Sequence, residues 1–287
     1  MARIKVEGYE LAERIGTGAN SVIYKARRKG TQEVYAVKVV PRRSKADDKY
    51  VDQVTNEFAV ASRFDHPNLV RVFDLQRIQR FWRLRQCNLV LEWVDGFDLE
   101  VVNRYPVRQL VSFYIQVAQG LGYMHGRGFI HADIKPANII VHRQTKTAKI
   151  VDFGITRRIG VPKGRVQGTM NFIAPEQMLK GRIDERTDIY NLGASFYNVF
   201  TNRHLPRPVM TGLKDLQEVN LKERPTPASA LNPDVPGAVS ELIQWSTQHR
   251  PEERPKSMDE VIGKLKGVLL ELQDAQNESG KPEGTQC

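Results

Sequence analysis

The chain has 287 residues, of which 40% are hydrophobic and 26% are charged, a composition that is ordinary for a folded protein and excludes general disorder. The formal net charge of +10 favours acidic partners such as nucleotides, phosphoproteins or acidic peptides, while the lack of a zinc-ligand cluster or RNA-binding signature argues against nucleic acid. The two cysteines cannot build a disulfide framework and no stretch approaches the roughly 20 apolar residues of a membrane span, so we expect a cytoplasmic protein.

Short strand-like segments fill the beginning of the chain. Segments 9–15, 21–26 and 34–40 carry β-branched and aromatic residues and are separated by glycine-bearing or charged turns. This pattern predicts three consecutive antiparallel strands. A helix is expected over 48–64, where apolar residues recur at three- and four-residue spacing and would pack on the sheet.

Two further strands are expected at 69–75 and 87–93, and the segment between them is strongly basic. The arginines of this connector are Arg77, Arg80, Arg83 and Arg85. Beyond it, apolar stripes with helical spacing run over 110–124, 189–200 and 258–272.

The predicted elements divide the chain into two parts. The fold class is therefore α+β, with a small antiparallel β-sheet lobe with one helix over about 9–94 and a larger, mainly helical lobe over about 95–272. The polar tail, 273–287, is expected to be disordered. A ligand site is expected in the cleft between two such lobes.

The first motif with chemical content is the sequence Gly-Thr-Gly-Ala-Asn-Ser at 16–21, which lies between two predicted strands. Glycines at such a turn allow backbone N–H groups to close over phosphates without interference from Cβ atoms. A strand rather than a helix follows, which argues against a dinucleotide-binding fold. Taken alone, the motif is explained better by an ordinary hairpin turn.

Lys38 is the second candidate, because it stands in an otherwise apolar strand and must reach solvent or find an anion. Glu57, on the following helix, could pair with Lys38 and direct its ammonium group toward phosphates. Taken alone, Lys38 is explained better as an ordinary lysine on an edge strand, and the alternative for Glu57 is a glutamate on the helix surface.

The third group of motifs is far more specific. The sequence His-Ala-Asp-Ile-Lys-Pro-Ala-Asn at 131–138 is followed by Asp-Phe-Gly at 152–154 and Ala-Pro-Glu at 174–176. With these motifs in this order, the chain resembles the eukaryotic-type (Hanks-type) serine/threonine protein kinases from Gly16 to Arg254. The resemblance implies a bilobal protein kinase-like fold and transfer of the ATP γ-phosphoryl group to serine or threonine hydroxyls of a protein.

The resemblance also implies roles for individual residues. Asp133 would accept or orient the proton of the substrate hydroxyl, while Asn138 and Asp152 would hold Mg²⁺, with Mn²⁺ as the alternative cation. The catalytic residues implied are Asp133, Lys135, Lys38, Glu57 and Thr169. Glu176 and Arg254 match a structural ion pair, and Asp188 matches an aspartate that holds the catalytic loop.

Nucleotide-binding residues are implied in the same way. The segment 89–94 resembles the hinge, with Leu91 as gatekeeper, Glu92 and Val94 meeting adenine through their backbones, and Asp98 binding the ribose. The full set implied is Ile15, Gly16, Gly18, Ser21, Ile23, Ala36, Lys38, Leu91, Glu92, Val94, Asp98 and Ile140. For the apolar members Ile23, Ala36 and Ile140, an ordinary place in the core is an equally good explanation.

The sequence departs from the family pattern where activity is usually regulated. Ala132 stands where the family commonly has an arginine that binds an activation-loop phosphate, and the only Ser, Thr or Tyr in 155–168 is Thr156. We therefore hypothesise that activity does not require activation-loop phosphorylation. The same segment contains Arg157, Arg158, Lys163 and Arg165. These charges are either simply solvated or bind an acidic substrate or partner.

Two further expectations concern the substrate and the competing functions. Ala137 replaces an acidic residue that basophilic relatives use, so no strong preference for basic target sites is expected. A pseudokinase that binds nucleotide or a partner without turnover is the main alternative, but Lys38, Asp133 and Asp152 are all retained. A small-molecule phosphotransferase is disfavoured because Ala-Pro-Glu at 174–176 indicates a platform for protein substrates.

Overall fold

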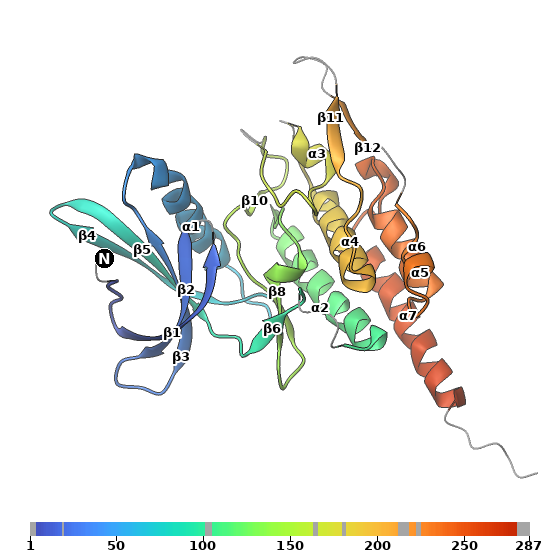
Figure 1. The fold of residues 1–287 in the computed structure, drawn as a ribbon, viewed down its shortest axis with the longest axis horizontal. Coiled ribbons are helices and arrows are strands. Elements are labelled where there is room, and N and C mark those ends of the chain that lie inside the picture. Colours follow the sequence, from blue (N-terminus) through green and yellow to red (C-terminus); the bar gives the residue numbers. More distant parts are fainter. Residues whose placement is uncertain are drawn as a thin grey trace, which may run out of the picture.

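The computed structural model describes residues 4–18, 20–100, 105–162, 166–179, 182–211, 218–221 and 225–279, with only the backbone described for 208–211, 218–221 and 275–279. The chain forms two lobes, and Figure 1 shows the sheet-rich N-terminal lobe beside the larger, mainly helical C-terminal lobe. This arrangement confirms the expected α+β bilobal fold.

A five-stranded antiparallel sheet with the order β1-β2-β3-β5-β4 forms the N-terminal lobe. Its strands are β1 (Tyr9–Gly18), β2 (Ser21–Arg28), β3 (Val34–Pro41), β4 (Val72–Arg80) and β5 (Arg83–Glu92), and α1 (Asp48–Ala61) packs against it after the short 3₁₀ turn η1 (Lys45–Asp47). Side chains alternate between two faces: Val90 joins a small cluster on one face, whereas Cys87, Leu89 and Leu91 join the main core. The sheet is therefore buried on the side that carries α1.

The basic connector differs from the expectation. Strands β4 and β5 extend through it and form a hairpin in which Arg80 pairs with Arg83 across a two-residue turn. The alternating apolar residues Ile78 and Leu84 are both partly buried, so the connector has the period-two pattern of strands in spite of its charge. Phe81 and Trp82 form the turn itself.

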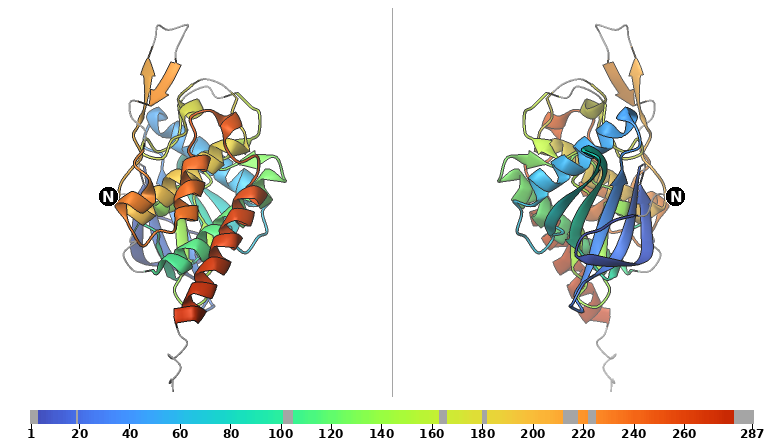
Figure 2. Two further views of the ribbon diagram at one scale, coloured as in Figure 1. Left: turned by 90° about the vertical axis from the view of Figure 1, so that its right-hand side faces the viewer. Right: turned by 90° about the vertical axis from the view of Figure 1, so that its left-hand side faces the viewer.

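The C-terminal lobe contains the three expected long helices, α2 (Val107–His125), α4 (Glu185–Thr201) and α7 (Met258–Ser279). Its other elements are β6 (Gly96–Asp98), β7 (Phe129–Ile130), η2 (Pro136–Asn138), β8 (Ile139–His142), β9 (Ala148–Ile150), β10 (Arg157–Arg158), α3 (Pro175–Met178), β11 (Pro208–Thr211), β12 (Glu218–Leu221), α5 (Ala228–Leu231), α6 (Gly237–Ser246) and η3 (Pro251–Glu253). Helix α7 continues past the expected end at 272 and packs along α2 and α6, as the left view in Figure 2 shows. No helix among the described residues is long and apolar enough to cross a membrane.

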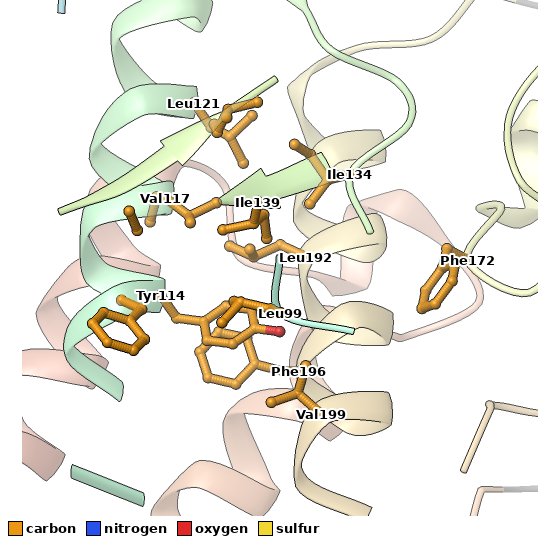
Figure 3. Close-up of a cluster of buried hydrophobic side chains, with 14 of the residues drawn as sticks. Leu99, Tyr114, Val117, Leu121, Ile134, Ile139, Phe172, Leu192, Phe196 and Val199 are labelled. Carbon is orange, nitrogen blue, oxygen red and sulfur yellow. The ribbon is translucent and has the colours of Figure 1, made fainter. Parts of the chain in front are cut away.

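The main core holds the long helices beneath the segment that contains the His-Ala-Asp motif. Tyr114 of α2 and Phe196 of α4 pack ring against ring, and the Tyr114 hydroxyl lies 2.9 Å from the Ser195 hydroxyl. Figure 3 shows the same cluster reaching Ile134 and Ile139, which lie on either side of η2. The loop from 131 to 138 therefore rests on a rigid apolar base.

Candidate active site

Lys38 links strand β3 to helix α1 in its own lobe and to the segment after β9 in the C-terminal lobe. Its Nζ atom, on β3, lies 2.8 Å from Oε2 of Glu57 on α1 and 3.0 Å from Oδ1 of Asp152, just after β9. The Glu57 side chain is 1% exposed, and its other oxygen accepts a hydrogen bond from the Phe153 backbone N–H. The lysine that the sequence placed in an apolar strand has therefore found two anions, one of them buried.

The charges of this group support one another. Burial opposes protonation of Lys38, but the carboxylates of Glu57 and Asp152 outweigh it and raise the pKa of the lysine above its ordinary value. The Lys38 ammonium lowers the pKa of Asp152 to about 2 against the opposing effect of desolvation. Lys38 is therefore a cation and Asp152 an anion throughout the physiological pH range.

A second cluster surrounds Asp133. Its Oδ1 atom accepts hydrogen bonds of 2.8 Å from both the backbone N–H and the hydroxyl of Thr169, and Lys135 Nζ donates to the same hydroxyl at 2.9 Å. Lys135 Nζ also lies 3.5 Å from Asp133 Oδ2. The three residues that the resemblance grouped together thus form one hydrogen-bonded unit.

Asp188, at the start of α4, fixes the backbone that carries Asp133. Its carboxylate accepts hydrogen bonds from the backbone N–H groups of His131 at 2.9 Å and Ala132 at 2.7 Å, and it contacts His125 Nε2 at 2.8 Å. Burial opposes ionisation of Asp188, but the hydrogen bond and charge of His125, followed by the other contacts, leave its pKa below the ordinary value. Ala132 has a φ of +66°, so these bonds hold a left-handed turn directly before Asp133.

Asn138 and Asp152 have the oxygen atoms that a hard divalent cation requires. Asn138 donates its amide N–H to the Asp133 carbonyl at 2.9 Å, which leaves its side-chain oxygen as an available ligand. The Asp152 side chain is 47% exposed even though one of its oxygens contacts Lys38. One carboxylate and one amide fit Mg²⁺, which usually retains waters and substrate phosphates in its coordination shell.

The glycine-rich motif forms the tip of the β1–β2 hairpin. Gly16 pairs with Ile23 and Gly18 pairs with Ser21, while Ala19 lies outside the described residues. A Cβ atom at Gly18 would come within 2.6 Å of the Ser21 hydroxyl oxygen. The absence of a side chain at Gly18 therefore leaves room for Ser21, which replaces the third glycine of the motif. Ile15, next to the first glycine, is exposed.

Strand pairing brings together most of the other residues expected to bind nucleotide. Ala36 on β3 lies opposite Leu91 on β5, and Asp98 on β6 lies opposite Ile140 on β8. Among the residues that the structure describes, none forms a hydrogen bond with the backbone of Val94. The Val94 backbone is therefore available to a ligand, as expected for a hinge.

Glu92 also has an internal role. Its carboxylate accepts a hydrogen bond from the backbone N–H of Arg71 at 3.1 Å and contacts Lys149 Nζ at 3.0 Å. These contacts tie the end of β5 to β4 and β9. The side chain of Glu92 is thus engaged in the protein, and only its backbone could serve a nucleotide.

Aliphatic side chains occupy the space around Ala132. We call this group the isoleucine cluster; it consists of Ile130, Ala132, Ile155, Ile159 and Ile183. Ala132 is 2% exposed, and Ile155 and Ile159 belong to the segment that follows Asp-Phe-Gly. Apolar contacts therefore join the catalytic loop to this segment at the position where the family commonly has an arginine.

The sequence did not single out Gln177, which links four parts of the site. Its buried amide donates to the carbonyls of Ala132 at 2.8 Å and Gln167 at 3.3 Å, and its oxygen accepts from the Ala174 N–H and the Asn191 amide, each at 2.9 Å. The available signals were the position of Gln177 directly after Ala-Pro-Glu and the presence of an amide, Asn191, within an apolar helical stripe.

The expected structural ion pair is also formed. Arg254 donates from both terminal nitrogens to Glu176, at 2.8 and 2.9 Å, and the Thr187 hydroxyl donates to the same carboxylate at 2.8 Å. The Arg254 side chain is fully buried. This pair fixes α3 against the C-terminal helices.

The family described as "Protein kinase domain" matches residues 9–264. The chain is 28% identical over 271 residues to a probable serine/threonine-protein kinase of Clostridium acetobutylicum, a match that covers 91% of this chain and 40% of that protein. It is 30% identical over 258 residues to serine/threonine-protein kinase PknA of Mycobacterium tuberculosis, covering 87% of this chain and 58% of PknA. A match to serine/threonine-protein kinase PknB of Mycobacterium leprae, 28% identical over 266 residues, covers 90% of this chain and 42% of PknB. The chain thus spans about half the length of these relatives.

Proposed function

The chain belongs to the protein kinase family, and from that membership we propose that it transfers the γ-phosphoryl group of Mg-bound ATP to serine or threonine hydroxyls of a protein substrate. One observation carries this proposal: two hydrogen-bonded groups of the site are both formed. In the first, Lys38 contacts Glu57 and Asp152, and in the second, Asp133 contacts Thr169, which also binds Lys135. A scaffold without turnover would not need both.

Each residue has a role that its contacts support. Thr169 donates two short hydrogen bonds to Oδ1 of Asp133, whereas Oδ2 has only the longer contacts of the Asn138 amide at 3.4 Å and Lys135 Nζ at 3.5 Å. Oδ2 is therefore the oxygen that would accept the hydrogen bond of the attacking hydroxyl and hold it in line. Lys135 offsets the negative charge of the phosphoryl group in transfer, and Lys38 binds the phosphates that stay behind. Mg²⁺ held by Asn138 and Asp152 would supply charge neutralisation for the phosphate oxygens.

The catalytic lysine indicates the type of hydroxyl. Lys135 contacts Thr169, the arrangement that the resemblance assigns to serine/threonine kinases, whereas tyrosine kinases usually have Ala-Ala-Arg or a similar sequence in this loop. We therefore propose serine and threonine, not tyrosine, as the acceptors.

The test is phosphate transfer from Mg-ATP to the protein itself and to a generic protein substrate, with sites identified by mass spectrometry. We expect phosphoserine or phosphothreonine with the wild type and none with Asp133→Asn. A wild type that binds ATP but transfers no phosphate to any protein tested would favour the pseudokinase alternative.

We also propose that activity is independent of activation-loop phosphorylation. Thr156, the only Ser, Thr or Tyr of 155–168, is 2% exposed and could not reach another kinase without local unfolding. The isoleucine cluster supplies apolar contacts where an arginine would otherwise bind a phosphate. The amide of Gln177 adds neutral hydrogen bonds between the catalytic loop and Gln167.

Phosphatase treatment tests this second proposal. The treated protein, shown by mass spectrometry to carry no phosphate, should retain the rate of the untreated protein toward an exogenous substrate. Loss of activity on treatment, with recovery after incubation with ATP, would contradict it.

The substrate preference follows from the charges near the site. Ala137 offers no carboxylate for an upstream arginine, and Arg157 and Arg158 add positive charge, while Lys163 and Arg165 lie outside the described residues. We propose no strong preference for basic sites. A peptide array in which upstream arginine dominates would contradict this.

A further inference from the structure

The tip of the β4–β5 hairpin exposes two large aromatic side chains. Phe81 is 81% exposed and Trp82 is 96% exposed, and nothing in the described part of the chain covers either ring. The Arg80 guanidinium lies 5.4 Å from the Phe81 ring centre, so a cation accompanies the aromatic pair. Neighbouring large aromatics at a protruding tip mark an interaction site more often than a structural one.

The backbone of this turn is also unsuited to aromatic residues. Phe81 and Trp82 have φ values of +48° and +62°, the left-handed region that both central residues of a type I′ turn require. Asn-Gly is the sequence that this turn favours, because bulky side chains are disfavoured at positive φ. The geometry of the turn therefore gives no reason for aromatic residues here, and a binding role would explain them.

Charge on the hairpin is entirely positive. No acidic residue occurs between Asp74 and Glu92, and the four arginines of this stretch are Arg77, Arg80, Arg83 and Arg85. None of them forms an ion pair with a residue that the structure describes. Arg80 and Arg83 face each other directly across the strands, an arrangement that repels unless an anion lies between or beside them.

We propose that this tip binds an anionic lipid surface, with Phe81 and Trp82 entering the headgroup region and the arginines binding lipid phosphates. Tryptophan favours the level of the headgroups, and clustered cations near an anionic leaflet add affinity. The sequence of the hairpin fits this arrangement. Phe81 and Trp82 form the tip, and Arg80 and Arg83 stand next to them on the two strands.

A lipid surface suits the shape better than a protein does. The hairpin lies at the end of the N-terminal lobe remote from the C-terminal lobe (Figure 1), and its tip is convex. A stable protein interface needs roughly 800 Å² on each partner, far more than a two-residue turn offers, whereas side-chain insertion between lipids needs no pocket.

Binding through this tip would leave the active site open. The turn and the hinge lie at opposite ends of β5, whose ten residues span roughly 30 Å. ATP and a protein substrate could therefore reach the site while the tip is bound. The proposal does not depend on the activity proposed above.

The experiment is co-sedimentation of the full chain with vesicles of phosphatidylcholine alone or with phosphatidylserine added. One variant, Phe81→Asn with Trp82→Gly, removes the aromatics but provides the preferred turn sequence; another, Arg80→Gln with Arg83→Gln, removes two charges. Lys264→Gln with Lys266→Gln, on the exposed face of α7, is the control with the same change in net charge. Circular dichroism of each variant checks that it is folded.

We expect the wild type and the α7 control to bind only the vesicles that contain phosphatidylserine. Binding should fall roughly fivefold for each arginine removed and should be lost when the aromatic pair is replaced. Trp82→Phe should also abolish a blue shift of tryptophan emission on binding. Equal binding by all variants would show that the hairpin is not the binding site, and an equal loss in the arginine variant and the α7 control would attribute binding to net charge; either result would overturn the proposal. Hairpin-dependent binding to a single-stranded oligonucleotide or an acidic peptide, without binding to vesicles, would overturn it in favour of that partner.

Discussion

Asp133 and Asp152 are both acidic residues of the site, but they contact different partners. Asp133, in the loop from 131 to 138, accepts hydrogen bonds from Thr169, whereas Asp152 contacts Lys38, the residue that we propose binds phosphate. We expect Asp133→Asn to lose phosphate transfer, by at least about a hundredfold in kcat, while keeping nucleotide affinity. Asp152→Ala should weaken Mg-ATP binding as well. Calorimetric titration with Mg-ATP and steady-state kinetics measure the two effects, and equal loss of binding in both variants would refute the division of roles.

The depressed pKa of Asp152 predicts a pH dependence of stability. Because this pKa is about 2 in the folded protein and near 3.9 when unfolded, the contribution is complete above about pH 5 and disappears as the pH falls toward 2. With solvent screening of a half-exposed group, we expect it to be about 1 kcal/mol. Urea unfolding of the wild type and Asp152→Asn should give a constant difference from about pH 8 to 5 that shrinks below pH 4. A difference that grows on acidification would contradict the assignment.

Most residues of the candidate site could be proposed from the sequence because the chemistry implied by the resemblance demands one side-chain type in a fixed local motif, and the structure brings these residues together. Asp133 and Asp152 are of this kind. Gln177 could not be predicted, since its four hydrogen-bond partners come from distant segments and an amide fits many environments. The apolar surroundings of Ala132 could not be predicted either, because they come from distant segments of the chain. The sequence alone shows only that an alanine stands where the family commonly has an arginine.

Gln177 connects helix α3 with the loops around it, so its replacement tests how that element is held. Gln177→Glu would place a carboxylate oxygen where the amide now donates to two carbonyls, Ala132 and Gln167. We expect a loss of about 1–3 kcal/mol in the free energy of unfolding and a lower kcat with unchanged affinity for ATP. Gln119→Glu, at an exposed site on α2, is the matched control. Equal behaviour of the two variants would argue against a positioning role for Gln177.

The β4–β5 turn allows a separate test of backbone strain. Replacing Phe81-Trp82 by Asn-Gly should raise the free energy of unfolding by about 1–2 kcal/mol, because both residues have positive φ. Replacement by Ala-Ala, which removes the rings but retains Cβ atoms, should give no such gain. Urea denaturation of both variants decides the matter, and equal stability would show that the turn is not strained.

The helices and the first strands were predictable because their apolar periodicity matches the face that they bury. The β4–β5 hairpin was misread, since four arginines and a turn without glycine suggested an irregular connector. Cross-strand pairing up to Arg80 and Arg83 prevails over that local signal. Pairing of strands is a property of the folded sheet and is only weakly encoded in either segment.

The Glu176–Arg254 pair contributes at the scale of the whole molecule, since it joins residues 78 positions apart. Arg254→Met leaves a carboxylate with one hydroxyl partner in a mostly buried site and should destabilise the protein by about 3–5 kcal/mol. Adding Glu176→Gln should restore part of that loss. Thermal and urea unfolding of the single and double variants measure the coupling free energy between Glu176 and Arg254. If the losses of the two single variants add in the double variant, the two residues do not stabilise each other.

The isoleucine cluster gives the activation segment a response to temperature and ionic strength that a phosphate-binding arginine would not give. Attraction between a phosphate and a guanidinium weakens as salt screens it, whereas contact between aliphatic side chains does not depend on screening. Apolar association weakens on cooling, because its driving force near room temperature is entropic. We therefore expect the contacts of Ile155 and Ile159 with the isoleucine cluster to persist in concentrated salt and to weaken in the cold.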